Sequence, residues 1–218
     1  MVHFTLFGIP VYIRPSFWVV LAIFGGALSI SSVEDLIYPA LFVIAGFVAI
    51  LSHEMGHALV GRKLGGGQQT IVLELFGGLT RSHGMQLTRG GRALMILAGP
   101  MMTLLLGIIS LWLTWNIVAP VMTSYNLNFW DLAISPFTAA LISPKLYILS
   151  CLIMIGEWWT ILNLLPIYPL DGGQLIAQYI RSPRKVFMTG FITAILIGLL
   201  SFQLFHGYFI PIFMALFA

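Results

Sequence analysis

Residues 51–58 of the chain read LSHEMGHA and place two histidines and a glutamate inside an apolar run that begins near Pro39. A helix brings residues i and i+4 to one face, so His53 and His57 can offer two imidazole nitrogens to one metal ion, with Glu54 beside them. This is the HExxH arrangement. A catalytic zinc site uses three protein ligands and keeps one position for water. The motif therefore predicts a zinc site that takes two of its three ligands from this helix.

The composition around the motif is that of a membrane protein. Of the 218 residues, 59% are hydrophobic and 8% are charged, whereas an ordinary soluble domain is roughly 25% charged. The mean hydropathy is +1.00. Three ionisable side chains within two helical turns are costly to insert into a bilayer, and such residues usually mark function. We therefore interpret the motif as a metal site within a membrane, and not as a chance match on a soluble helix.

The apolar runs predict an all-α polytopic membrane protein with about six transmembrane helices. We expect helices at about 16–30, 36–60, 93–118, from 145 onwards and at 186–205, while 209–218 is either a short sixth helix or a truncated chain end. No polar stretch is long enough to fold as a separate soluble domain. A single intramembrane domain over 1–218 follows, with its catalytic core at about 36–180.

Two segments outside these helices have the pattern of β structure. Residues 2–12 predict a short strand or an interfacial segment. Residues 68–81 carry β-branched residues on either side of Gly77 and Gly78, which favours a small membrane-associated hairpin, although a plain connecting loop would also fit. The exposed edge of such a hairpin is suited to binding an unwound substrate as an added strand.

The basic residues give the orientation. When the helices are taken to cross the membrane alternately, nine fall on one side, namely Arg14, Arg62, Lys63, Arg81, Arg89, Arg92, Arg181, Arg184 and Lys185, and only Lys145 falls on the other. Positively charged loops stay in the cytoplasm. The N-terminus and the loops near the predicted site are therefore expected to be cytoplasmic in a multi-pass protein of the cell membrane. His53 precedes Arg62 by nine residues, or about 13 Å of helix, so the metal should lie in the cytoplasmic half of the bilayer.

The candidates for the third ligand are Glu74, His83, Glu157, Asp171 and His206. Depth disfavours the two in the cytoplasmic loop and the histidine near the opposite face. Glu157 lies earlier in its helix than Asp171 and is hence deeper in the membrane. Two prolines and a glycine pair end the regular helix at 163–173. Asp171 lies at that break, at the depth of the histidines, and is the predicted third ligand; the alternative is that it only caps a helix.

The other polar side chains near this break have candidate roles. Glu54 is the expected general base, which takes a proton from the attacking water. Asn163 either donates a hydrogen bond to the developing oxyanion or forms a hydrogen bond between helices. Glu157, expected to be buried, is either a packing hydrogen bonder or a cavity residue.

The sequence argues against disulfides, cysteine metal sites and nucleic-acid binding. Cys151 is the only cysteine, so the chain has no intrachain disulfide and no cysteine-cluster metal site. The basic residues sit in short loops and form no continuous patch, so nucleic acid is not an expected partner.

Several motifs together resemble the site-2 protease family of intramembrane zinc metalloproteases. They are HEMGH at 53–57, FGG at 76–78, Gly99 with Pro100, and the stretch from Asn163 to the LDGG motif at 170–173. The resemblance covers roughly residues 1–180. Taken without the resemblance, Gly99 and Pro100 predict only a helix kink that serves packing.

The resemblance implies one zinc ion per chain bound by His53, His57 and Asp171, with Glu54 catalytic. It implies hydrolysis of a peptide bond within or near the transmembrane segment of a single-span membrane protein, such as an anti-sigma factor or a transcription factor precursor. We expect a compact member without a PDZ insertion or a CBS domain. The alternatives are a different membrane zinc hydrolase, which LDGG disfavours, and a non-proteolytic membrane chaperone or binding protein on the same fold, which an intact Glu54 disfavours.

Overall fold

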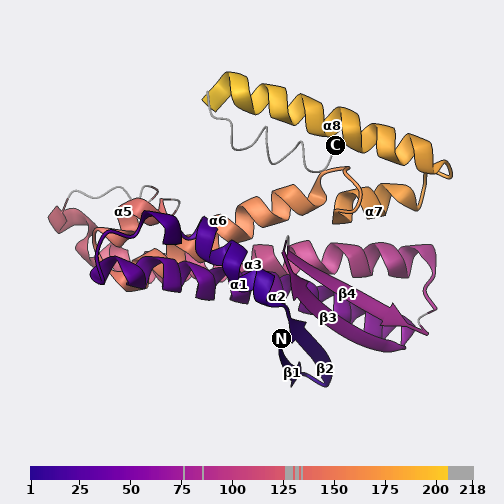
Figure 1. Cartoon of the computed structure of the whole chain (residues 1–218), viewed down its shortest axis with the longest axis horizontal. Helices are drawn as coiled ribbons and strands as arrows, with labels where there is room; N and C mark the ends of the chain where they lie inside the picture. The colour runs from indigo at the N-terminus through magenta and orange to yellow at the C-terminus, as the bar shows by residue number, and fades with distance from the viewer. Residues whose placement is uncertain (76, 85, 126–129, 131–132, 134, 206–218) are drawn as a thin grey trace. The chain divides into compact units, whose positions relative to one another are not determined.

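A computed structural model describes the whole chain except residues 76, 85, 126–129, 131, 132, 134 and 206–218 (Figure 1). The chain divides into two compact units, residues 1–160 and 161–218, which are described separately. The first contains β1 (Val2–Leu6), β2 (Ile9–Ile13), α1 (Pro15–Phe24), the 3-10 turns η1 (Ala27–Ser29) and η2 (Glu34–Leu36), α2 (Ile37–Gly65), β3 (Gln68–Glu74), β4 (Gly77–His83), α3 (Arg89–Tyr125), α5 (Pro136–Ala140) and most of α6 (Pro144–Leu164). The second contains the end of α6, α7 (Asp171–Ala177) and α8 (Pro183–Phe205).

Four strands form one sheet in the order β1-β2-β3-β4. The predicted hairpin is confirmed, because β3 and β4 pair antiparallel with Ile71 opposite Thr80. Residues 2–13 form a second hairpin, of which β2 pairs parallel with β3, with Val11 opposite Ile71. Parallel pairing joins segments far apart in sequence, so no local pattern predicted it.

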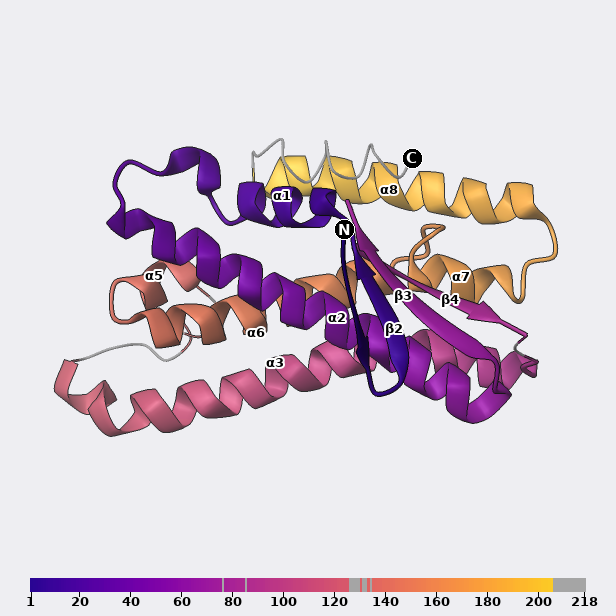
Figure 2. The ribbon, with the colours of Figure 1, turned by 60° about the horizontal axis from the view of Figure 1, so that its bottom comes forward.

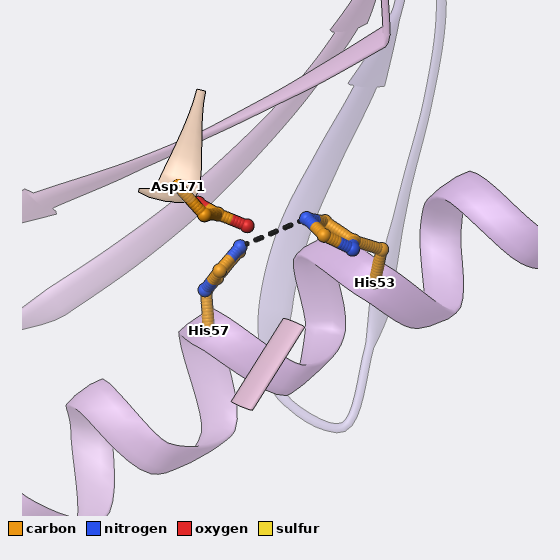
Figure 3. Close-up of side chains that lie close together, drawn as sticks. All are labelled: His53, His57 and Asp171. Carbon is orange, nitrogen blue, oxygen red and sulfur yellow. Dashed lines mark hydrogen bonds between the residues drawn. The ribbon is translucent and has the colours of Figure 1, made fainter. Parts of the chain in front are cut away.

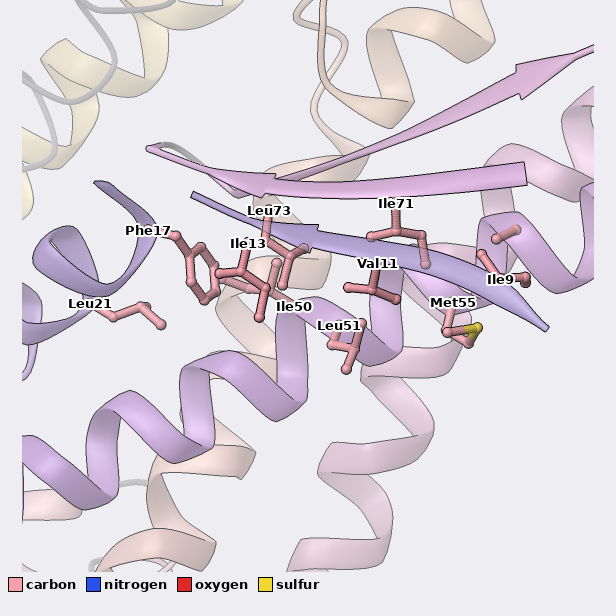
Figure 4. Packing of buried hydrophobic residues seen from close by; sticks show 11 residues of the cluster. Ile9, Val11, Ile13, Phe17, Leu21, Ile50, Leu51, Met55, Ile71 and Leu73 are labelled. Carbon is pink, nitrogen blue, oxygen red and sulfur yellow. The ribbon is translucent and has the colours of Figure 1, made fainter. Parts of the chain in front are cut away.

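One face of the sheet is buried against α2. Ile9, Val11 and Ile13 of β2 alternate with more exposed residues, as expected for a strand with one buried face. They form one apolar cluster with Ile71 and Leu73 of β3, Phe17 and Leu21 of α1, and Ile50, Leu51 and Met55 of α2, seen in Figure 4. The sheet is thereby fixed to the part of α2 that carries the HEMGH motif.

Four helices are long and apolar enough to cross a membrane: Glu34–Gly65, Arg89–Ala119, Pro144–Leu164 and Pro183–Ser201. The first expected span is wrong in length, because α1 ends at Phe24 after ten residues, or about 15 Å. Gly25 and Gly26 follow it, and Gly26 adopts φ +86°, a conformation that ends a helix. Residues 209–218 lie outside the described part of the chain, so four of the roughly six expected spans are present among the described residues.

Helices α2 and α3 run beside each other in the first unit (Figure 2). Gly56 of α2 allows this approach, since a Cβ there would lie 2.8 Å from the carbonyl carbon of Ala98 and from Cγ of Met102. Gly156 of α6 would place a Cβ 2.9 Å from the carbonyl oxygen of Thr103 of α3. Small residues of this kind let membrane helices pack closely, and they bring α3 against the motif helix.

Candidate metal centre

The HEMGH motif lies on a buried stretch of α2. His53, Glu54 and His57 are 2%, 5% and 8% exposed. One turn of helix separates the two histidines, and their Nε2 atoms lie 3.1 Å apart. Two nitrogens bound tetrahedrally to one zinc ion at about 2.05 Å would lie roughly 3.3 Å apart. The spacing of the two imidazoles therefore fits shared coordination of one zinc ion.

A hydrogen bond from the neighbouring helix sets the orientation of one of these rings. His57 Nδ1 lies 2.8 Å from the carbonyl oxygen of Met95 in α3. A carbonyl oxygen only accepts, so Nδ1 carries the proton and donates it, which leaves the lone pair of His57 on Nε2. Metal-binding histidines are commonly held in this way by a backbone carbonyl. Met95 was not singled out from the sequence, because its side chain has no part in the contact.

Gly99 of α3 lies directly against both imidazoles. A Cβ at this position would overlap Nε2 and Cε1 of His57 and would lie 2.9 Å from Nε2 of His53. Glycine is therefore required here by the space that the two Nε2 atoms need, in addition to any packing role. The sequence interpretation missed this, because nothing local to Gly99 and Pro100 shows that the motif helix packs beside them.

Pro100 leaves α3 continuous. Its carbonyl oxygen accepts hydrogen bonds from the Thr103 hydroxyl at 2.9 Å and from the Thr160 hydroxyl of α6 at 3.3 Å. The two hydroxyl oxygens lie 2.9 Å from each other, and both side chains are buried. These contacts tie α3 to α6 one turn from Gly99, so the helix that confines the imidazoles is itself held in place.

The Glu54 side chain projects toward β4, where it contacts Thr80 and Gly78. The Thr80 hydroxyl donates to Glu54 Oε2 at 2.7 Å and lies 3.1 Å from the carbonyl oxygen of Glu54. Gly78 lies against the Glu54 side chain, since a Cβ there would overlap its Cγ and carboxyl group. Neither contact was predicted, because β4 meets α2 only through the tertiary fold.

In the second unit, Asp171 is the first residue of α7 and is 6% exposed. The two glycines after it permit a compact turn: a Cβ on Gly172 would lie 2.5 Å from the carbonyl carbon of Leu164, and one on Gly173 would lie 2.5 Å from the carbonyl oxygen of Ile167. The predicted helix break is thus confirmed between Leu164 and Asp171. Asn163, 8% exposed, lies in the last turn of α6 just before it.

The three predicted ligands form a candidate metal-binding group. One ligand atom each of His53, His57 and Asp171 lies within 4.8 Å of the other two, as drawn in Figure 3. Two imidazole nitrogens and one carboxylate oxygen, all from buried side chains, are a donor set typical of catalytic zinc. The residues present therefore fit a zinc ion.

The other candidates for the third ligand differ in their surroundings. Glu74 forms an ion pair with Arg14, with Oε2 2.7 Å from Nη1. His83 is an exposed residue at the end of β4, and His206 lies outside the described residues. Glu157 was expected to be buried, and this is wrong, because it is exposed on α6 beside Trp158.

Comparison with known proteins places the chain in a family. The model of peptidase family M50 matches residues 41–205. The chain is 29% identical over 174 residues to a zinc metalloprotease of Methanocaldococcus jannaschii, covering 79% of this chain and 43% of that protein. It is 28% identical over 188 residues to a putative zinc metalloprotease of Synechocystis sp., covering 81% of this chain and 43% of that protein. The chain thus spans less than half the length of these curated relatives.

A solved structure has the same fold. The site-2 protease from Methanocaldococcus jannaschii matches with a TM-score of 0.56 at 23% sequence identity, over 93% of this chain and 82% of that one. At this identity the likeness shows the fold alone. Since the family model covers most of the chain and the fold agrees, the predicted site-2 protease resemblance is confirmed, and the chain belongs to peptidase family M50.

Proposed function

We propose that the protein is an intramembrane zinc metalloprotease that hydrolyses a peptide bond within or near the transmembrane segment of another membrane protein. The observation that carries this proposal is the buried group of His53, His57 and Asp171. Glu54 lies on the same helix as the two histidines, next to His53. Among the described residues, four apolar helices are long enough to span a membrane, which supports a site within the lipid bilayer. The relatives named as zinc metalloproteases support the reaction type.

The residues have distinct roles in this proposal. His53, His57 and Asp171 hold one zinc ion, which when bound polarises the peptide carbonyl and acidifies a water molecule. Glu54 accepts a proton from that water while the water oxygen attacks the carbonyl carbon of the peptide. Glu54 then delivers the proton to the leaving nitrogen as the C–N bond breaks. Asn163 donates a hydrogen bond to the oxygen that gains negative charge. A protein that had kept the fold only for binding would have no need of a positioned base, which argues against the chaperone alternative.

The substrates we propose are single-span membrane proteins, such as anti-sigma factors or transcription factor precursors. A peptide bond in a transmembrane helix is shielded by its own hydrogen bonds, and unwinding in hydrocarbon leaves backbone groups unpaired. Strand β4 is the last strand of the sheet order, so among the described strands its outer edge is available for pairing. A substrate segment added there would regain backbone hydrogen bonds beside Glu54.

A matched pair of substrates tests this proposal. One carries two glycines in the cytoplasmic half of its span, and in the other both are leucine, which stabilises the substrate helix by about 1.5–2 kcal/mol. We expect the leucine form to be cleaved roughly tenfold more slowly by the purified protein in detergent, because unwinding precedes cleavage. Binding is measured separately with the Glu54→Gln protein. Equal rates at equal binding would contradict a limiting unwinding step, and a chelator-insensitive reaction would contradict the zinc mechanism.

The orientation we propose has the N-terminus, the sheet and the loop after α7 on the cytoplasmic side of the cell membrane, which the sequence positions of nine of the ten basic residues favour. Single cysteines in a Cys151→Ser background test it with a membrane-impermeant thiol reagent on intact cells. Lys145→Cys is expected to react, whereas His83→Cys and Ser182→Cys should react only after the membrane is opened. Reaction of Ser182→Cys in intact cells would reverse the orientation.

A further inference from the structure

We propose that Thr80 is a positioning residue for the catalytic base, through which strand β4 fixes Glu54 in the geometry needed for proton transfer. This inference rests on the proposed function, because it assigns a second residue to the same reaction. Thr80 is not part of the HExxH motif and does not belong to the candidate metal-binding group.

The contact is specific to the side-chain hydroxyl. Thr80 is in the middle of β4, opposite Ile71 of β3, and its side chain points to the face of the sheet that packs on α2. Its hydroxyl proton is directed at Glu54 Oε2 at 2.7 Å, while the carbonyl oxygen of the same residue lies 3.1 Å away. A hydroxyl has one proton to donate, and a charged carboxylate is the stronger acceptor. Thr80 therefore restrains the rotation of the Glu54 carboxyl group through Oε2.

A second residue of β4 restricts the same side chain. Gly78 has no side chain and lies against Cγ and the carboxyl group of Glu54. Gly77 is in turn covered by the Trp159 indole of α6, since a Cβ there would lie 2.9 Å from its ring. Strand β4 is thus held between α6 and Glu54, and the base has little freedom to leave the orientation that Thr80 sets. Glutamate has three rotatable side-chain bonds, so an unrestrained base would spend most of its time in unproductive rotamers.

This arrangement links substrate binding to catalysis. β4 is the proposed docking edge, and its inward face holds the base, so a substrate strand aligned on β4 is placed in a fixed register relative to Glu54. Deleting the hydroxyl is therefore expected to lower kcat while leaving KM and zinc content unchanged. A residue that only stabilised the fold would lower the amount of folded protein instead.

The test compares Thr80→Val, Thr80→Ser and Ser82→Ala in the purified protein. Valine has the shape of threonine without the hydroxyl, and kcat is expected to fall by about 10- to 100-fold, as when a catalytic group loses its alignment. Serine keeps the hydroxyl and is expected to restore most of the rate. Ser82 is the matched control, because it also points inward from β4 but its hydroxyl donates to Gln69 and not to Glu54.

Each outcome bears on one proposal only. Wild-type kcat in Thr80→Val, or an equal loss of rate in Thr80→Ser, would overturn the positioning role while the protease assignment stands. If Thr80→Val does not fold, the serine and alanine variants decide: folded Thr80→Ala with wild-type kcat overturns the role, and a loss of kcat that serine reverses supports it. Absence of cleavage by the wild type on every substrate would instead contradict the proposed function.

Discussion

The Glu54→Gln protein is expected to lose cleavage activity and to keep its bound zinc. The change replaces a carboxylate by an amide of the same size, which removes the proton acceptor while leaving the fold and both histidines intact. General base catalysis contributes on the order of 10³-fold to such reactions, so residual activity should fall below ordinary detection in a co-expression assay. Metal analysis of the purified variant should give the same zinc content as the wild type.

Asp171→Asn is the matched counterpart, because it makes the same carboxylate-to-amide change at a proposed ligand. It is expected to lose both cleavage and tightly held zinc, since a neutral amide is a poor ligand for zinc. Both variants are therefore expected to be inactive, but only Glu54→Gln is expected to contain zinc. Loss of zinc from folded Glu54→Gln would place Glu54 among the ligands. Full zinc and activity in Asp171→Asn would remove Asp171 from them.

The features that could be predicted from the sequence are those that depend only on residues close together in the chain. The spacing of His53, Glu54 and His57 on one buried helix was predicted from HEMGH because helical periodicity is a local property. The helix break before Asp171 followed in the same way from its prolines and glycines, and the hairpin at 68–81 from its glycine pair. Each of these three features is present in the structure.

The features that the sequence did not reveal depend on which segments meet. The carbonyl of Met95, the hydroxyl of Thr80 and the missing side chain of Gly99 all act on residues of α2 from other elements. None has a distinctive pattern, since a backbone carbonyl, a strand threonine and a helix glycine are common everywhere. The expected burial of Glu157 failed for the same reason: the face that α6 turns to α3 is set by Gly156 and Thr160.

Gly99→Ala is the second change for which we expect a large effect, although it adds only one methyl group. In most exposed or loosely packed helix positions this substitution stabilises the folded protein, because alanine has the higher helix propensity by about 1 kcal/mol. At Gly99 the added Cβ would occupy space now taken by Nε2 of His57 and would crowd Nε2 of His53. One or both rings must rotate away, and their nitrogens would then no longer face a common point.

We therefore expect folded Gly99→Ala to bind zinc at least about 100-fold more weakly, a loss at the upper end of that seen for residues that orient metal ligands, and to be inactive at ordinary zinc concentrations. Gly107→Ala is the matched control on the same helix, two turns further on, where the nearest atoms to a new Cβ lie 3.9 Å and 4.0 Å away. That variant should keep wild-type zinc and activity. Zinc titration of both purified variants, with thermal unfolding to confirm that each is folded, makes the comparison. If the two variants bound zinc equally well, the imidazoles would have room that the structure does not show, and Gly99 would have only the packing role that its sequence suggests.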